Sequence, residues 1–155
     1  MARTQILGFS DLHSIYNVTF PVGPNMPNVR DDVLLVQTLL KLANFKGNGK
    51  GEAANETSCT IEVDGCFGEQ TKRLIESFEA CVREKHLLLT ADGVIEPSSP
   101  DGYTPEGVIY KIIHLNRFAR QATQSGNRYD LLPIDPGIHP GLRQSLSSEH
   151  QAFFE

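Results

Sequence analysis

The side chains that could do chemistry in this chain are 5 histidines, 3 cysteines and 19 carboxylates. Hydrolytic catalysis needs two carboxylates in one cleft, a Cys-His pair, or a zinc-binding set such as HExxH. The histidines are scattered, and none has a second histidine or an acid at ligand spacing on an expected helix. The residue types and their spacing therefore predict no catalysis and no cofactor.

Two short pairings come closest to a reactive site. Asp11 and His13 would share a face of a strand and could bind a metal, but no third ligand lies near them in the sequence. A solvated loop is the preferred interpretation. Cys81 and His86 are five residues apart where a helix is expected to end, so we expect no Cys-His pair there.

The cysteines are odd in number and form no CxxC motif; they are Cys59, Cys66 and Cys81. The simplest interpretation is three small, partly buried thiols in a reducing compartment. A Cys59–Cys66 disulfide across the intervening turn is the alternative in an oxidising compartment. The sequence leaves the redox state of the three open.

Composition narrows the class of protein. The chain has 155 residues, enough for about one domain, and 39% are hydrophobic, which suggests one compact core with extensions. The net charge of −5 argues against nucleic-acid binding. No apolar run has the length of a signal peptide core or a membrane span. We expect synthesis in the cytoplasm without a cleavable signal peptide, and no membrane partner.

Hydrophobic periodicity predicts three helices. The first runs from 29 to about 44 with Asn28 as its N-cap, the second spans about 69–84, and the third starts at Thr104-Pro105-Glu106. Gln37 lies among apolar residues of the first helix, so it is either a buried hydrogen-bonding residue or a groove residue. A short strand at 59–63 and an extended piece at 87–89 complete the prediction.

The predicted fold is mainly α: a compact three-helix bundle with short strands and Asp-Gly turns over 28–118. An irregular N-terminal arm (1–27) and a proline-broken C-terminal arm (119–155) flank it. Residues 131–141 are apolar but contain three prolines, so they lie extended. They either cover the protein's own core, which we prefer, or dock on a partner. A last short helix is expected within 142–154, anchored by Phe153 and Phe154.

The order of these elements resembles the peptidoglycan-binding-like domains. The resemblance covers 28–118 and rests on three blocks: Asn28-x-x-Asp31-Asp32-Val33-x-x-Val36-Gln37-x-Leu39-Leu40, Val63-Asp64-Gly65-x-Phe67-Gly68-x-x-Thr71-x-x-x-Ile75-x-x-Phe78, and Asp92-Gly93-Val94-Ile95-x-Pro97 with Leu115-Asn116. Three features depart from the family: Phe78-Glu79 replaces a Phe-Gln pair, the loop 46–58 is long, and 98–102 is an insertion.

The resemblance implies a small three-helix module that holds cell-wall glycan or stem peptide. The motif residues Asp64, Gly65, Phe67, Gly68 and Thr71 are expected to be structural, with Phe67 in the core and Thr71 bonding near the helix start. A ligand groove would lie between the first two helices. Its expected wall residues are Gln37, Asn44, Phe45, Asp64 and Arg73, with Arg73 suited to peptide carboxylates.

The expected function is therefore a non-catalytic bacterial cell-wall (peptidoglycan) binding module, accessory to a secreted or injected effector. The alternative is a protein–protein adaptor, associated with type VI or phage-like secretion, that keeps the fold without glycan binding and docks its partner through 131–141. Either protein would leave the cytoplasm by a non-classical or contractile route. A third, weaker possibility is an enzyme whose residues converge only in space.

Overall fold

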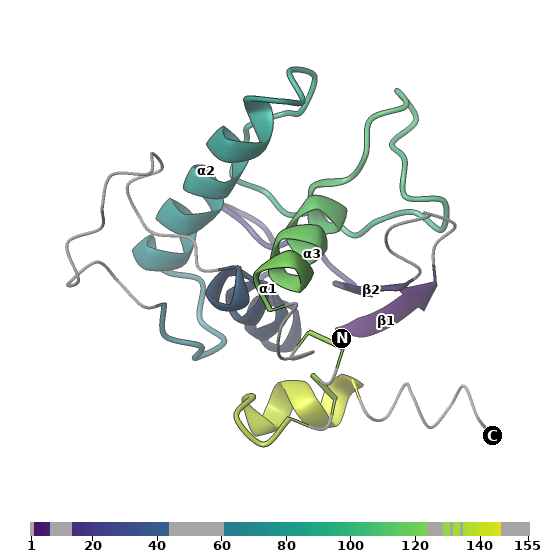
Figure 1. The fold of residues 1–155 in the computed structure, drawn as a ribbon. Coiled ribbons are helices and arrows are strands. Elements are labelled where there is room, and N and C mark those ends of the chain that lie inside the picture. Colours follow the sequence, from purple (N-terminus) through teal and green to yellow (C-terminus); the bar gives the residue numbers. More distant parts are fainter. Residues whose placement is uncertain are drawn as a thin grey trace.

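The computed structural model describes residues 2–6, 14–43, 61–123, 129–130, 132–133 and 135–146 (Figure 1). Within these ranges the chain is mainly helical, as predicted. It forms β1 (Arg3–Ile6), β2 (Ser14–Asn17), α1 (Arg30–Leu42), α2 (Glu69–Arg83), α3 (Lys111–Ala122) and a fourth, short helix at 140–146. No helix among the described residues is long and apolar enough to cross a membrane.

Helix α1 is the centre of the core. Every residue from Asp32 to Leu40 is buried, and α1 contacts both α2 and α3. A helix that is enclosed on all sides needs apolar residues around most of its circumference, and the leucines and valines of α1 supply them. The prediction of this helix is confirmed to within two residues at its C-terminal end.

The predicted N-cap of α1 is wrong. Asn28 has a positive φ of 48°, and its side chain bonds the N–H and C=O of Gly23 at 2.9 Å each. The N-cap is Val29, without a side-chain bond. Asn28 therefore closes the preceding turn, because an asparagine tolerates positive φ better than most residues.

The N-terminal arm is not irregular throughout. Strands β1 and β2 pair antiparallel, with Arg3 opposite Asn17 and Ile6 opposite Ser14. The backbone N–H of Tyr16 donates to Oδ1 of Asn116 at 2.9 Å, which ties β2 to α3 across 100 positions. Partners so distant in sequence are invisible to a local pattern, and this explains the missed hairpin.

Helix α2 is confirmed, whereas α3 begins six residues later than predicted, with Tyr110 in place of Thr104 as its N-cap. Thr104 accepts a bond from the N–H of Val108 at 3.1 Å, and Gly107 has φ +82°. These residues form a tight turn closed by a bridge between Tyr103 and Ile109. The cap-like residues therefore start a turn, and the positive φ of Gly107 rules out a helix through it.

Two short segments also differ from prediction. Residues 61–63 form no strand, and 59–60 lie outside the described residues. The segment 87–89 is a turn closed by the N–H of Leu89 and the carbonyl of His86 at 3.1 Å. Leu89 is buried, but Leu87 and Leu88 are 79% and 82% exposed, so the leucine run does not pack as a whole.

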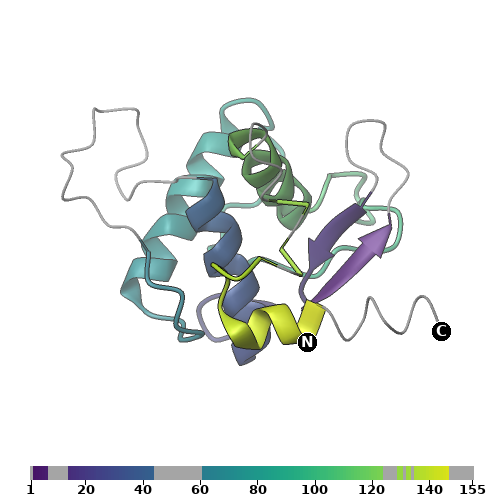
Figure 2. The same cartoon turned by 60° about the horizontal axis from the view of Figure 1, so that its bottom comes forward.

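The described part of the C-terminal arm packs on the protein's own core, which was the preferred interpretation. Its buried apolar side chains are Tyr129, Leu132, Ile138, Leu142 and Leu146. Figures 1 and 2 show the helix at 140–146 beside the start of β1, where Ser145 donates to the carbonyl of Ala2 at 3.1 Å. This helix starts earlier than predicted, and 147–155 lie outside the described residues.

Candidate functional site

Gln37 joins α1 to the first Asp-Gly turn and to α2. Its amide nitrogen donates to Oδ1 of Asp64, the carbonyl of Cys66 and the hydroxyl of Thr71 at 3.0–3.1 Å. Its amide oxygen accepts from the N–H groups of Asp64 (3.1 Å) and Gly65 (2.9 Å). Because Gln37 is only 1% exposed, it is the buried hydrogen-bonding residue of the two predicted roles.

The first Asp-Gly turn owes its shape to its own two residues. Asp64 accepts from the N–H of Cys66 at 2.9 Å, and this bond, followed by that from Gln37, lowers the pKa of the Asp64 carboxyl. Gly65 has φ +78°, and a Cβ there would lie 2.7 Å from Cγ of Arg30. Glycine is therefore required at this position for both conformation and space.

The second Asp-Gly turn is held in the same way by a charged pair. Both carboxylate oxygens of Glu79 accept from the N–H of Gly93, at 2.9 and 3.0 Å. Asp92 accepts from the N–H of Val94 at 3.0 Å, as Asp64 does from Cys66. The unit of helix, buried side chain, Asp-Gly turn and next helix thus occurs twice, with Gln37 and then Glu79 at its centre.

Lys111 is the residue that sequence reasoning missed. Its ammonium nitrogen lies 2.8 Å from Glu79, 2.5 Å from Asp92 and 2.9 Å from the carbonyl of Thr90. The side chains of Lys111 and Glu79 are 9% and 2% exposed. Glu79, where the resemblance expects a glutamine, therefore has a buried cation as its partner. Nothing in the local sequence pattern indicated this pair.

One pocket lies beside the first turn, between α1 and the C-terminal arm, and we call it the α1–arm pocket. Its volume is about 260 Å³, and it is lined by Thr38, Lys41, Leu42, Val63, Gly137, Ile138 and His139. Nδ1 of His139 accepts from the N–H of Gly141 at 3.0 Å, so Nε2 carries the proton of the neutral ring. Lys41 and His139 thus offer N–H donors to an anion.

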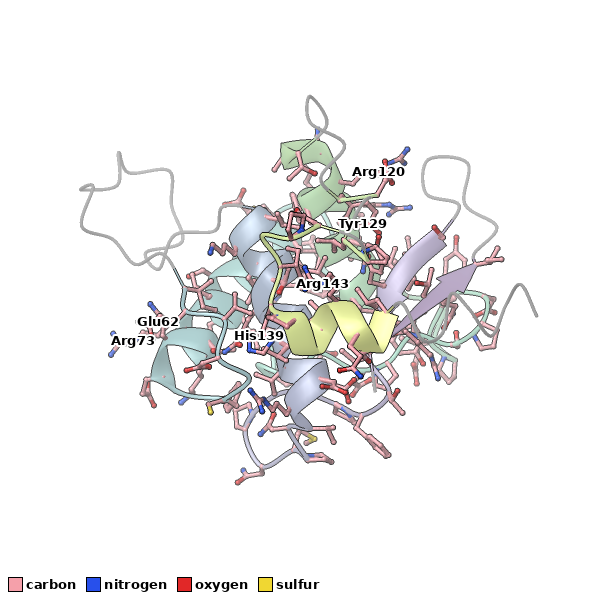
Figure 3. All side chains as sticks on the ribbon, turned by 90° about the horizontal axis from the view of Figure 1, so that it is seen from below. Glu62, Arg73, Arg120, Tyr129, His139 and Arg143 are labelled. Carbon is pink, nitrogen blue, oxygen red and sulfur yellow. The ribbon has the colours of Figure 1, made fainter. Side chains whose placement is uncertain are left out.

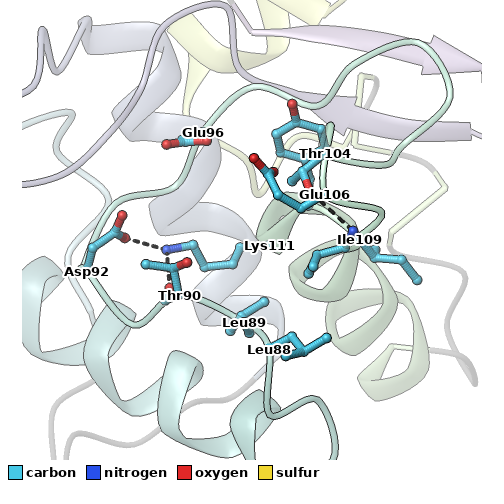
Figure 4. Close-up of a pocket in the computed structure, with 11 residues that line it drawn as sticks. Leu88, Leu89, Thr90, Asp92, Glu96, Thr104, Glu106, Ile109 and Lys111 are labelled. Carbon is cyan, nitrogen blue, oxygen red and sulfur yellow. Dashed lines mark hydrogen bonds and ion pairs between the residues drawn. The ribbon is translucent and has the colours of Figure 1, made fainter.

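A second pocket of about 290 Å³ lies beside the second turn, and we call it the second-turn pocket (Figure 4). Its acidic lining is Asp92, Glu96 and Glu106. Figure 4 shows Leu88 and Leu89 on the opposite side of Lys111 from Glu96 and Glu106. This pocket combines an apolar wall with an acidic one.

The predicted site residues do not gather in one groove. Arg73 points outward from α2 (Figure 3), its side chain is 71% exposed, and its Nε lies 3.9 Å from Glu69. It lines neither of the two pockets. Phe67, which was predicted in the core, is half-buried and packs against the core cluster from its edge. Asn44 and Phe45 lie outside the described residues.

Gly68 and Thr71 complete the motif. Gly68 is the N-cap of α2 with extended backbone, and a Cβ there would meet nothing within 4 Å, so its conformation does not require glycine. Thr71 is buried and bonds Gln37, as the expected structural role implies.

The cysteines and histidines form no predicted pair within the described part of the chain. Cys66 and Cys81 are free thiols, while Asp11, His13 and Cys59 lie outside that part. No group of three His, Cys, Asp or Glu side chains among the described residues could hold a metal ion. The unpredicted contact is between the rings of His86 and His114, whose centroids are 4.6 Å apart.

Comparisons of this chain with protein-family models, with curated proteins and with solved structures found no match.

Proposed function

We propose that this protein is a non-catalytic module that binds bacterial peptidoglycan through the α1–arm pocket. The observation that carries the proposal is the position of this pocket beside the motif residues of the resemblance. Thr38 and Val63 line it, and they are the chain neighbours of Gln37 and Asp64. The hydrogen bonds between Gln37 and Asp64 fix the backbone next to Thr38 and Val63, so these two pocket residues have defined positions.

The lining chemistry supports a stem-peptide carboxylate as the ligand group. Lys41 is exposed at the end of α1, and His139 faces the pocket from the arm. An ammonium and an imidazole N–H are suitable donors to a carboxylate. The volume of about 260 Å³ is close to the lower end of ligand pockets, roughly 300–1,000 Å³, which fits a terminal amino acid better than a glycan chain.

The test is retention of the purified protein on insoluble peptidoglycan sacculi. We expect the wild type to sediment with sacculi, and Lys41→Ala/His139→Ala to weaken retention by about tenfold, the effect of losing one or two charge-assisted hydrogen bonds. Lys85→Ala is the matched control, because it removes an exposed cation that lines neither pocket. Arg73→Ala tests the wall position that the resemblance implied.

Failure of the wild type to sediment with sacculi would refute wall binding. Equal loss in Lys85→Ala and in the double variant would show attraction by charge alone, without a defined pocket. Circular dichroism of the wild type and of each variant would establish that a loss of retention does not come from unfolding.

A protein–protein adaptor is the second candidate function, and one observation favours it. Leu87 and Leu88 are 79% and 82% exposed at the edge of the second-turn pocket. The arm is the weaker docking surface, because Leu132 and Ile138 already lie in the core. The two candidate functions therefore use different faces.

A further inference from the structure

The second-turn pocket has an apolar side that no segment covers within the described part of the chain. Leu88 lines it and is 82% exposed, and the neighbouring Leu87 is 79% exposed. Tyr103, in the turn before α3, is 43% exposed. Exposed leucines in adjacent positions are uncommon on a protein surface, and they mark a binding face when a polar rim borders them.

The charge of the pocket selects the chemistry of its occupant. The lining holds three carboxylates and one ammonium, a net of −2. The ammonium of Lys111 is already engaged by Glu79, Asp92 and Thr90, so it offers nothing further to an anion. Glu96 and Glu106 are exposed, and each leaves its carboxylate available to a cation.

The titration of Asp92 is consistent with a negative pocket at neutral pH. Burial alone would raise the pKa of its carboxyl, but the hydrogen bonds from Lys111 and the N–H of Val94, together with the charge of Lys111, lower it below 3.8. Arg83 and Lys85 lie nearby in the chain but do not line the pocket.

We propose that the second-turn pocket docks a basic, amphipathic peptide segment of a partner protein. A lysine of that segment would place its ammonium between Glu96 and Glu106, and apolar side chains would cover Leu87 and Leu88. Charge complementarity decides this occupant, because an acidic segment or a second copy of this net-negative chain would meet like charge.

This inference goes beyond wall binding and does not rest on it. In Figure 1 the arm, which lines one pocket, lies at the bottom, and the turns after α2 and before α3, which line the other, lie at the top. A protein with both surfaces could hold the wall at one end and a partner at the other.

The experiment measures binding of a short, fluorescein-labelled synthetic peptide in which leucines alternate with lysines, by anisotropy with the full-length protein. We expect saturable binding that weakens by about three- to tenfold in Glu96→Gln/Glu106→Gln, the size expected for two exposed ion pairs. Leu88→Ser should weaken it too. Glu76→Gln is the matched control, since it removes an exposed carboxylate from α2 outside the pocket.

Two comparison peptides separate charge from shape: one carries glutamates in place of lysines, and one carries serines in place of leucines. Both should bind more weakly than the leucine-lysine peptide. Equal affinity of the wild type and the double variant would overturn the proposal, as would equal binding of the glutamate peptide. Displacement of the peptide by soluble wall fragments would also overturn it, because the pocket would then be a wall site.

Retention on sacculi should be unchanged in Glu96→Gln/Glu106→Gln, so the two proposals fail independently.

Discussion

His114 is a buried histidine whose environment changes its acid–base chemistry. It is 5% exposed on α3, and its ring lies 4.6 Å from that of His86. Burial first, and then the charges of His86 and Arg117, lower the pKa of His114 from 6.5 to about 4. A buried neutral imidazole of this kind makes the stability of the fold depend on pH, because the unfolded chain takes up the proton more readily.

The direction of the pH dependence follows from the pKa of His114 in the unfolded state, 6.5, and in the folded state, about 4. Above pH 6.5 His114 is neutral in both states, and between pH 6.5 and about 4 only the unfolded state is protonated, so stability falls as the pH falls. We expect this histidine to remove about 3 kcal/mol across that interval. Urea unfolding of the wild type and His114→Gln over that range measures it. Equal pH slopes for the two proteins would show that His114 is not buried neutral.

At the scale of elements, a unit of helix, Asp-Gly turn and helix occurs twice in the chain. The first unit uses a neutral amide, Gln37, and the second uses the ion pair of Glu79 and Lys111. In both units one side chain satisfies turn N–H groups that would otherwise be buried without a partner. Because the neutral Gln37 and the charged Glu79 both accept hydrogen bonds from turn N–H groups, we expect that a neutral side chain can replace the charged one in the second unit.

A double-mutant cycle tests that equivalence. Glu79→Gln alone leaves Lys111 with one carboxylate, and Lys111→Met alone leaves the Glu79 carboxylate buried without its cation; we expect each to cost about 3 kcal/mol of unfolding free energy. The double variant leaves a neutral amide at the centre of the unit, as Gln37 is in the first, so it should cost less than the sum of the single variants, with a coupling of about 1–3 kcal/mol.

The exposed i,i+4 pair Glu69–Arg73 provides the control cycle. Its side chains are 73% and 71% exposed, and coupling there should stay within about 0.5 kcal/mol. Additive losses at Glu79 and Lys111 would show that the two side chains do not act as a pair.

Local sequence signals predicted the elements whose stability is local in origin. The helical spacing of apolar residues predicted α1 and α2. The Asp-Gly dipeptides predicted both turns, where Gly65 and Gly93 have φ of +78° and +76°. The start of α3 was wrong because the turn at Gly107 overrides the helix-start residues before it. The β1–β2 hairpin and Lys111 depend on partners that come together only on folding.

In the candidate site, too, the sequence indicates local features and not those that depend on distant partners. Gln37 was recognisable as a polar residue on an apolar face, but only the structure decides between core and groove. The α1–arm pocket was not predictable, because segments that lie far apart in the sequence wall it. The second-turn pocket is lined by residues between 88 and 111, where the start of α3 was predicted too early. Arg73 has the right charge for a peptide carboxylate, but it lies on the outer face of α2 and lines neither pocket.

At the scale of the whole molecule, the C-terminal arm completes the core. The hydroxyl of Tyr16 donates to the carbonyl of Tyr129 at 2.8 Å, and the hydroxyl of Tyr129 donates to Asn116 at 2.5 Å. The two tyrosine rings pack edge to face with centroids 5.0 Å apart. This network joins β2, α3 and the arm. The arm also forms one side of the α1–arm pocket, so the wall binding that we propose for that pocket would require a packed arm.

Leucine-to-alanine substitution at two matched positions tests that packing. Leu142 is fully buried in the helix at 140–146, and Leu87 is 79% exposed. We expect Leu142→Ala to lower the unfolding free energy by about 2–5 kcal/mol, because it leaves a cavity in the core. Leu87→Ala should change it by less than about 0.5 kcal/mol. Denaturant unfolding of the full chain measures both. If Leu142→Ala were as mild as Leu87→Ala, the arm would be detached in solution. Its apolar side chains would then be free to dock on a partner, and the α1–arm pocket would lose one of its walls.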